Sequence, residues 1–208
     1  MTSVRASGKP NKTLIFIGVL AVCGLVAFSA KIGLETAGIF VNHTPSMPLG
    51  IYRHVGGAIE RGSIITFCPP PAAVAYARHW HPEEDGKSKD CASSQEPYVK
   101  YAAALSGDEV RVDQNGVHVN GGAALPGSRP LVRIRTGNTT RVMPNVIGKT
   151  WKLKDGEVWA ATPEWYSMDS RYYGPVSGVR LARMIIVAPD SPETEAPEFI
   201  KKMQVSAR

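Results

Sequence analysis

Acidic residues are absent from the first 34 positions of this 208-residue chain, where four basic residues lie: Arg5, Lys9, Lys12 and Lys31. From residue 32 onward, 20 basic and 18 acidic residues nearly balance, so the net charge of +6 comes mostly from the N-terminus. A nucleic-acid-binding protein concentrates its basic excess in the folded domain. The acid-free stretch 129–154 holds seven basic residues but only one aromatic, Trp151, which favours a solvated or membrane-facing loop. Nucleic-acid binding is therefore not expected.

Charge is also missing from Leu14 to Ala30, a run of 17 residues with basic residues on both sides. As a helix this run is ~26 Å long, the short end of what spans a bilayer. We favour a retained anchor over residues 14–34, because the apolar core of a cleaved signal peptide usually has only ~7–15 residues. A signal peptide cut after Ser29 or Ala30 is the alternative. Either way, the basic N-terminus, residues 1–13, is expected to stay in the cytoplasm, and the residues beyond about 35 are expected to lie outside it.

The chain has only three cysteines. Cys23 lies within the apolar run and is interpreted as a small buried hydrophobe. Cys68 and Cys91 bracket a polar, proline-rich insertion, and outside the cytoplasm we expect them to form a disulfide. His79 and His81 lie between them, but the spacings match no standard zinc pattern, so neither a metal site nor a cofactor is expected.

No internal repeat is visible, and beyond the apolar run helical patterns are scarce. Short β-type segments punctuated by Gly, Pro and Asn dominate instead. The expected strands cover residues 63–67, 98–105, 109–112, 117–119, 157–161 and 183–187, with a hairpin turn at Asn115-Gly116. One helix is expected at 72–79, inside the insertion 68–91. The sequence thus predicts a mainly antiparallel β domain over 43–189 and a loose tail over 190–208.

The chain contains neither a Gly-x-Ser-x-Gly elbow nor a Ser-x-x-Lys motif, so the hydrolases that use those patterns are excluded. Ser46 lies between Pro45 and Pro48, which restrict the backbone and hold the serine on a rigid segment. Taken alone, this segment is also consistent with an ordinary proline-rich turn. A serine nucleophile needs an adjacent base. Three histidines could serve, although nothing in their context selects one: His43, His54 and His118.

A lysine can act as the base only if desolvation keeps it neutral. Lys100 is the candidate, because it lies within an apolar strand in which both faces carry Tyr, Val, Ala or Leu. The other lysines of the domain lie in polar loops, on a solvent-facing strand or in the tail. Burial of a charged lysine would cost several kcal/mol. The alternative interpretation is a lysine that snorkels from the end of the strand.

Three segments together resemble the signal peptidases, most closely their conjugative-transfer branch, the TraF peptidases. HTPSMPLGIYR resembles the nucleophile segment, YVKYAAALSGDEVRV the lysine segment, and SMDSRYYGPV the third segment. The resemblance implies a signal-peptidase- or LexA-like antiparallel β catalytic domain with one N-terminal transmembrane helix. It implies a serine endopeptidase with Ser46 as nucleophile, Lys100 as general base and Asp169 as a further catalytic residue.

The resemblance also implies supporting roles. The Ser46 backbone N–H and the Thr44 hydroxyl would form the oxyanion hole, and Arg171 would pair with Asp169. Three further residues are expected to be structural: Ser170, Gly107 and Asp108. Two features depart from the housekeeping pattern: Tyr101 follows the lysine instead of Arg, and residues 162–165 replace a Gly-Asp-Asn sequence.

The implied substrate is a conjugative pilin precursor, cut at the outer face of the bacterial inner membrane by a single-pass protein with a periplasmic catalytic domain. Head-to-tail cyclisation of the pilin could follow, and other proteins of the conjugation apparatus are expected partners. The alternatives are a housekeeping type I signal peptidase acting on secretory precursors and a non-catalytic assembly factor of a secretion or conjugation apparatus. A self-cleaving repressor fits poorly, because an anchor would keep it from DNA.

Overall fold

The computed structural model describes residues 12–80, 90–93, 95–136, 138–144, 146–189, 191, 199 and 201. The chain forms two compact units, residues 1–40 and residues 41–208. Several expectations fall outside the described residues, namely those for residues 1–11, for most of the tail and for the part of the insertion that contains His81.

The first unit consists mainly of the helix α1 (Lys12–Thr36). Its segment Ile15–Leu34 has a mean hydropathy of 2.3 and is long and apolar enough to cross a membrane. Twenty helical residues span about 30 Å, which equals the thickness of the hydrocarbon core. A signal sequence has the same properties, so the helix alone fits both interpretations of this segment.

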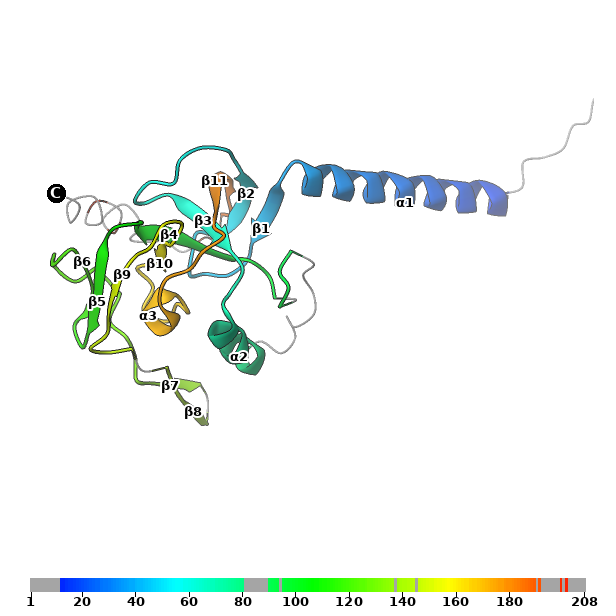
Figure 1. Ribbon diagram of the computed structural model, residues 1–208. Helices are drawn as coiled ribbons and strands as arrows, with labels where there is room; N and C mark the ends of the chain where they lie inside the picture. Colours follow the sequence, from blue (N-terminus) through cyan, green and yellow to red (C-terminus); the bar gives the residue numbers. More distant parts are fainter. Residues whose placement is uncertain are drawn as a thin grey trace, which may run out of the picture. The chain divides into compact units, whose positions relative to one another are not determined.

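The second unit is built on a six-stranded sheet with the strand order β1-β2-β11-β3-β4-β10 (Figure 1). Every pairing for which the register is known in this sheet is antiparallel. The strands are β1 (Ile39–Asn42), β2 (Gly50–His54), β3 (Ile64–Phe67), β4 (Tyr98–Ala104), β10 (Trp159–Ala161) and β11 (Arg180–Val187). Strand β4 lies between β3 and β10 and has only Tyr98 partly exposed, so both of its faces are covered.

Two smaller sheets complete the unit. One has the order β6-β5-β9, formed by β5 (Glu109–Asp113), β6 (Gly116–Val119) and β9 (Thr150–Lys152). Its β5–β6 turn is closed by the Asp113 carboxylate, which accepts hydrogen bonds from the N–H groups of Asn115 and Gly116. The other sheet is the hairpin of β7 (Arg133–Thr136) and β8 (Thr139–Val142).

The helix α2 (Pro71–Trp80) lies in the insertion, whose ends are joined by the Cys68–Cys91 disulfide. Tyr76 of α2 donates a hydrogen bond to the Val142 carbonyl of the β7–β8 hairpin. Tyr76 also packs on a small core that includes Tyr172 of α3 (Ser170–Tyr173). The insertion is thereby attached to the short helix that follows Asp169.

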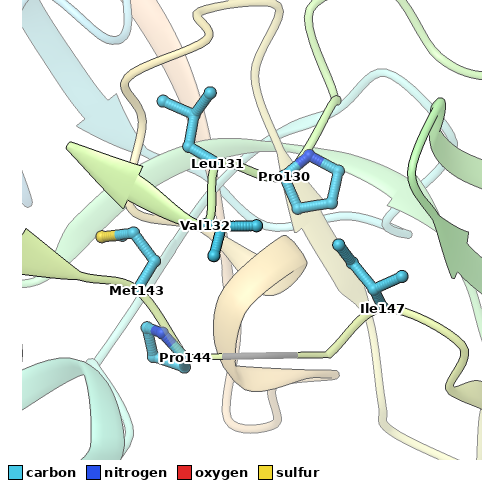
Figure 2. Close-up of a pocket in the computed structure, with 6 residues that line it drawn as sticks. All are labelled: Pro130, Leu131, Val132, Met143, Pro144 and Ile147. Carbon is cyan, nitrogen blue, oxygen red and sulfur yellow. The ribbon is translucent and has the colours of Figure 1, made fainter.

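An apolar pocket lies beside the β7–β8 hairpin (Figure 2). Six residues line it: Pro130, Leu131, Val132, Met143, Pro144 and Ile147. None of them carries an ionisable or nucleophilic side chain, so the pocket supplies no chemistry of its own.

The mainly β class, the hairpin at Asn115-Gly116 and the helix predicted at 72–79 are confirmed. The sequence did not reveal β1, β2, β7, β8 or α3. In the range predicted to be a loose tail, the described residues make contacts with the domain. Ser191 Oγ accepts a hydrogen bond from the Leu49 N–H, and the Phe199 ring, with 0% exposure, lies 5.9 Å from the Tyr101 ring.

Candidate active site

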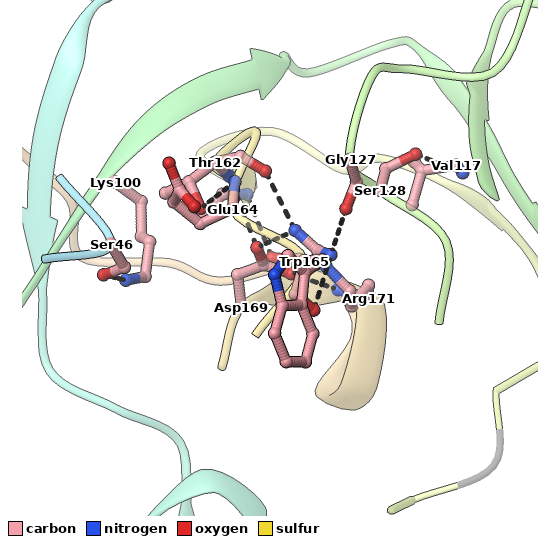
Figure 3. A network of polar contacts seen from close by, with 12 residues as sticks. Ser46, Lys100, Val117, Gly127, Ser128, Thr162, Glu164, Trp165, Asp169 and Arg171 are labelled. Atoms are coloured by element: carbon pink, nitrogen blue, oxygen red, sulfur yellow. Dashed lines mark hydrogen bonds and ion pairs between the residues drawn. The ribbon is translucent and has the colours of Figure 1, made fainter. Parts of the chain in front are cut away.

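Ser46 and Lys100 are 54 residues apart in sequence, yet Lys100 Nζ lies 2.8 Å from Ser46 Oγ (Figure 3). Ser46 occupies the turn between β1 and β2, and Lys100 lies in β4. A separation of 2.8 Å is within the range over which a proton passes directly between two groups. The fold therefore brings the predicted nucleophile and the predicted base together.

Lys100 is 5% exposed and lies in β4 of the six-stranded sheet, opposite Ile65 of β3. Burial lowers the pKa of its amine from 10.5 to about 8. Two charges act more weakly and in opposite directions, since Asp169 raises this pKa and Arg171 lowers it. Desolvation decides the outcome because burial penalises the charged ammonium form. At pH 7 about a tenth of the amine is neutral, ~300-fold more than at the ordinary pKa.

The Ser46 turn presents a free backbone donor. Among the residues that the structure describes, none accepts a hydrogen bond from the Ser46 N–H. Thr44 is exposed, and its hydroxyl donates to Asn42 Oδ1 at 2.8 Å. The Ser46 N–H is therefore available to a ligand as it stands, whereas the Thr44 hydroxyl must first rotate away from Asn42.

Asp169 and Arg171 form a buried ion pair (Figure 3). Arg171 Nε lies 2.8 Å from one carboxylate oxygen and Arg171 NH2 lies 2.7 Å from the other. Both side chains have 0% exposure. Asp169 is also the N-cap of α3, because it accepts a hydrogen bond from the Arg171 N–H at 3.1 Å. The pair fixes the start of α3.

The remaining donors of Arg171 connect this pair to two other segments. The guanidinium donates to the carbonyls of Thr162 and Gly127, and the Thr162 N–H donates to Asp169. Ser170 Oγ accepts a hydrogen bond from the Ala160 N–H at 2.9 Å, which ties α3 to β10. These contacts place Asp169 next to the sheet that carries Lys100, in agreement with its influence on the lysine pKa.

Gly107 and Asp108 lie in the turn after β4 and make no contact with Ser46 or Lys100. Gly107 has φ +86°, a conformation that favours glycine. The Asp108 carboxylate accepts hydrogen bonds from the Leu105 N–H, from Asn120 Nδ2 and from Arg61. These contacts join the end of β4 to the β6-β5-β9 sheet, and neither residue carries the chemistry.

The histidines that could have served as bases do not contact Ser46. His43 lies 3.7 Å from Glu96 with its side chain 55% exposed, and His54 bonds to Thr66. His118 Nε2 lies 3.1 Å from the Asp113 carboxylate, and His118 Nδ1 bonds to the Gly122 carbonyl. The described residues contain no group of three or more His, Cys, Asp or Glu that could hold a metal ion. Lys100 is therefore the base candidate that the geometry selects.

Several residues at the site were not found by sequence reasoning. Asn42 and Tyr52 hold the Ser46 turn through hydrogen bonds to its carbonyls, and the Tyr166 hydroxyl donates to the Pro45 carbonyl at 3.2 Å. Ser167 is buried, and its hydroxyl has no hydrogen-bond partner among the described residues. The prolines of the turn were a signal for such supporting residues. A proline has no N–H to donate, so hydrogen-bond donors for the carbonyls of the turn must come from the surrounding chain.

Residues 12–201 match the family described as signal peptidase, peptidase S26. Curated relatives include the "Plasmid transfer protein TraF" of Escherichia coli, 28% identical over 80% of this chain and 90% of that protein. The "Probable conjugal transfer protein TraF" of Sinorhizobium fredii is 31% identical over 85% of this chain and 87% of its own. The "Conjugal transfer protein TraF" of Agrobacterium tumefaciens is 31% identical over 80% and 89%, respectively.

Proposed function

The chain belongs to the signal peptidase family, peptidase S26, and we propose that it is a serine endopeptidase that cleaves through a Ser46–Lys100 dyad. The observation that carries the proposal is the 2.8 Å separation between the serine hydroxyl and a buried amine whose pKa is lowered to about 8. A lowered pKa matters because only the neutral amine has a lone pair with which to accept a proton.

In the proposed first step, neutral Lys100 takes the proton of Ser46 as Oγ attacks the peptide carbonyl of the substrate. The resulting ammonium then gives that proton to the leaving amine, and the acyl group remains on Ser46. In the second step, Lys100 accepts a proton from water or from an amine that attacks the acyl-enzyme. The Lys100 ammonium then gives this proton to Ser46 Oγ as the bond between Oγ and the acyl carbon breaks, which releases the product and restores the serine hydroxyl and the neutral amine.

The Ser46 N–H is the proposed first donor of the oxyanion hole, because no described residue occupies it. The Thr44 hydroxyl is the proposed second donor, after it rotates away from Asn42. Removal of one oxyanion donor typically lowers kcat by ~10²–10³-fold.

Asp169 is proposed to act on Lys100 through its charge. It offsets part of the lowering that burial and Arg171 impose on the lysine pKa, so that the amine titrates near neutral pH. Arg171 in turn holds the carboxylate in place by the two-point ion pair.

The substrate we propose is a conjugative pilin precursor. The proposal is supported by three relatives, at 28–31% identity over most of the chain, that are named as plasmid or conjugal transfer proteins. The helix α1 is proposed to be a retained anchor in the bacterial inner membrane. The basic residues before it would keep the N-terminus in the cytoplasm and put the catalytic domain in the periplasm.

The test is processing of a precursor panel by the full-length protein in membranes. Wild type, Ser46→Ala and Lys100→Ala are compared on a pilin precursor and on several secretory precursors. We expect cleavage of the pilin by the wild type alone. Broad cleavage of secretory precursors would instead indicate a housekeeping signal peptidase, and full activity of either variant would refute the dyad. If the wild type cleaves none of the precursors and Ser46 is not labelled by an acylating probe, the chain is a non-catalytic assembly factor.

The fate of the acyl-enzyme can be read from the mass of the pilin. Cyclisation by the N-terminal amine of the pilin leaves a product one water lighter than the mature linear chain. A positioned amine can compete with water because of its high effective concentration. Mass spectrometry of pilin from cells with and without this protein distinguishes the two outcomes.

A further inference from the structure

The turn that carries Ser46 cannot satisfy its own carbonyl groups. Pro45 and Pro48 lack an N–H, and the one backbone hydrogen bond within the turn, from the Met47 N–H to the Thr44 carbonyl, is long at 3.4 Å. Buried carbonyls without a donor cost ~1–3 kcal/mol each. Side chains outside the turn must therefore donate to it.

Asn42, the last residue of β1, supplies most of these donors. Its Nδ2 lies 3.0 Å from the Thr44 carbonyl, 3.2 Å from the Met47 carbonyl and 3.0 Å from the Pro48 carbonyl. Its Oδ1 accepts from the Thr44 N–H at 3.3 Å and from the Thr44 hydroxyl at 2.8 Å. One amide with 5% exposure thus bonds to the chain on both sides of Ser46.

Tyr52 provides a second donor on one side of the turn. Its hydroxyl, on a side chain with 0% exposure, donates to the Pro48 carbonyl at 2.6 Å. Burial raises the pKa of this phenol well above its usual value, so it keeps its proton throughout the working range. The Tyr52 hydroxyl donates to Pro48, on one side of Ser46, whereas Asn42 donates to Thr44 and Pro48, on both sides of it.

We propose that Asn42 is a positioning residue for catalysis: it clamps the turn so that Ser46 Oγ faces Lys100 and the Ser46 N–H faces the substrate. This inference rests on the proposed Ser46–Lys100 function. Asn42 is buried, and among the described residues no hydrogen bond joins it to Lys100, so it acts on the nucleophile and not on the base or on substrate docking. A displacement of a reacting group by ~1 Å can lower the rate ~10²-fold.

The test is Asn42→Ala in the full-length protein, assayed on the cleaved precursor or on a peptide that spans its cleavage site. We expect kcat and the rate of Ser46 acylation by a probe to fall ~10–100-fold, and KM to stay within about threefold. The acidic limb of the pH–rate profile should not move, because Asn42 is uncharged and does not touch Lys100. Asn42→Asp keeps the acceptor for Thr44 but loses the two N–H donors of the amide, so it should be as slow as Asn42→Ala.

Ser128→Ala is the matched structural control. Ser128 is 1% exposed, and its hydroxyl joins the Val117 N–H to the Leu125 carbonyl. This variant should lower the melting temperature but leave kcat unchanged at temperatures where the protein is folded. If neither Asn42 variant folds, Tyr52→Phe tests the positioning of the turn instead, because it removes the hydrogen bond to the Pro48 carbonyl. We expect its kcat to fall several-fold.

The possible failures are distinguishable. Activity in Ser46→Ala would overturn the proposed function itself. The positioning role alone would be overturned if Ser46→Ala is inactive while folded Asn42→Ala keeps the wild-type kcat. If the Asn42 variants do not fold, a wild-type kcat in Tyr52→Phe has the same meaning. If the kcat of Asn42→Ala returns to the wild-type value on cooling, as the variant refolds, Asn42 has a structural role only.

Discussion

The carboxylate of Asp169 and the guanidinium of Arg171 form a two-point ion pair in which neither side chain is exposed. Isolated buried charges are costly, and a pair offsets the cost only when the remaining hydrogen-bonding groups are also satisfied. Arg171 meets this condition through the carbonyls of Thr162 and Gly127. The pair therefore ties the segment around Asp169 to the rest of the domain, and its two charges also influence the pKa of Lys100.

Removal of one partner should destabilise the domain strongly. We expect Arg171→Ala to lower the free energy of unfolding by about 3–5 kcal/mol, because it leaves Asp169 as an uncompensated buried charge. Arg111→Ala is the control, since the Arg111–Asp113 pair has an arginine side chain that is 51% exposed and should contribute at most about 1 kcal/mol. Urea denaturation measures both. An equal loss of unfolding free energy in Arg171→Ala and Arg111→Ala would contradict the claim that the buried pair stabilises the domain more than the exposed pair.

Replacement of Lys100 by an apolar side chain of similar length should abolish cleavage without weakening the fold. Below pH 8 the wild type carries the cost of a buried ammonium, so Lys100→Met should be more stable by about 1–3 kcal/mol. Between pH 8 and 10.5 the folded amine is neutral while the unfolded chain still binds the proton, so wild-type stability rises with pH. The advantage of the variant should then shrink. Urea denaturation of both proteins at pH 6.5 and pH 10 measures this, and a wild type that is more stable at pH 6.5 would contradict it.

The two proposed oxyanion donors can be separated at Thr44. Thr44→Ser keeps a hydroxyl and should retain kcat within a few-fold, whereas Thr44→Val removes it and should lower kcat ~10²-fold or more. Thr44 is exposed and forms no part of the core, so both variants should melt close to the wild type. Steady-state kinetics on one peptide decide. Equal rates in Thr44→Val and Thr44→Ser would leave the Ser46 N–H as the sole donor from this turn.

The disulfide should support stability and not the chemistry. Cys68 and Cys91 are 23 residues apart, and closure of a loop of that length contributes ~3 kcal/mol. The double variant Cys68→Ala/Cys91→Ala should therefore melt at a lower temperature, while the folded protein keeps the wild-type kcat. Thermal melts with and without reductant measure the effect. A reductant-sensitive kcat in the folded state would show that the insertion acts on the active site.

The sequence was most informative where a residue conflicts with its surroundings. A lysine inside an apolar strand predicted Lys100, and an Asn-Gly pair between alternating residues predicted the β5–β6 hairpin. The short strands β1 and β2 gave no clear pattern, because their pairing depends on partners far away in the chain. For example, β2 pairs with β11 about 130 residues later.

Asn42 was missed for a related reason. An asparagine after a short run of apolar residues is ordinary, and its importance comes only from the three carbonyls that the folded turn places around it. Similarly, the Ser46–Lys100 contact joins positions 54 residues apart, so from sequence it rested on resemblance and not on local pattern.

The central claim is that burial lowers the pKa of one lysine amine next to one serine hydroxyl far enough for the amine to act as a base, and the pKa of Lys100 tests it most directly. The measurement is an NMR titration of the labelled lysine side chains in the full-length protein, with Lys100→Met to assign the signal. We predict that Lys100 titrates at about pH 8. A Lys100 signal that titrates near the ordinary value of 10.5, together with the other lysines, would contradict the dyad.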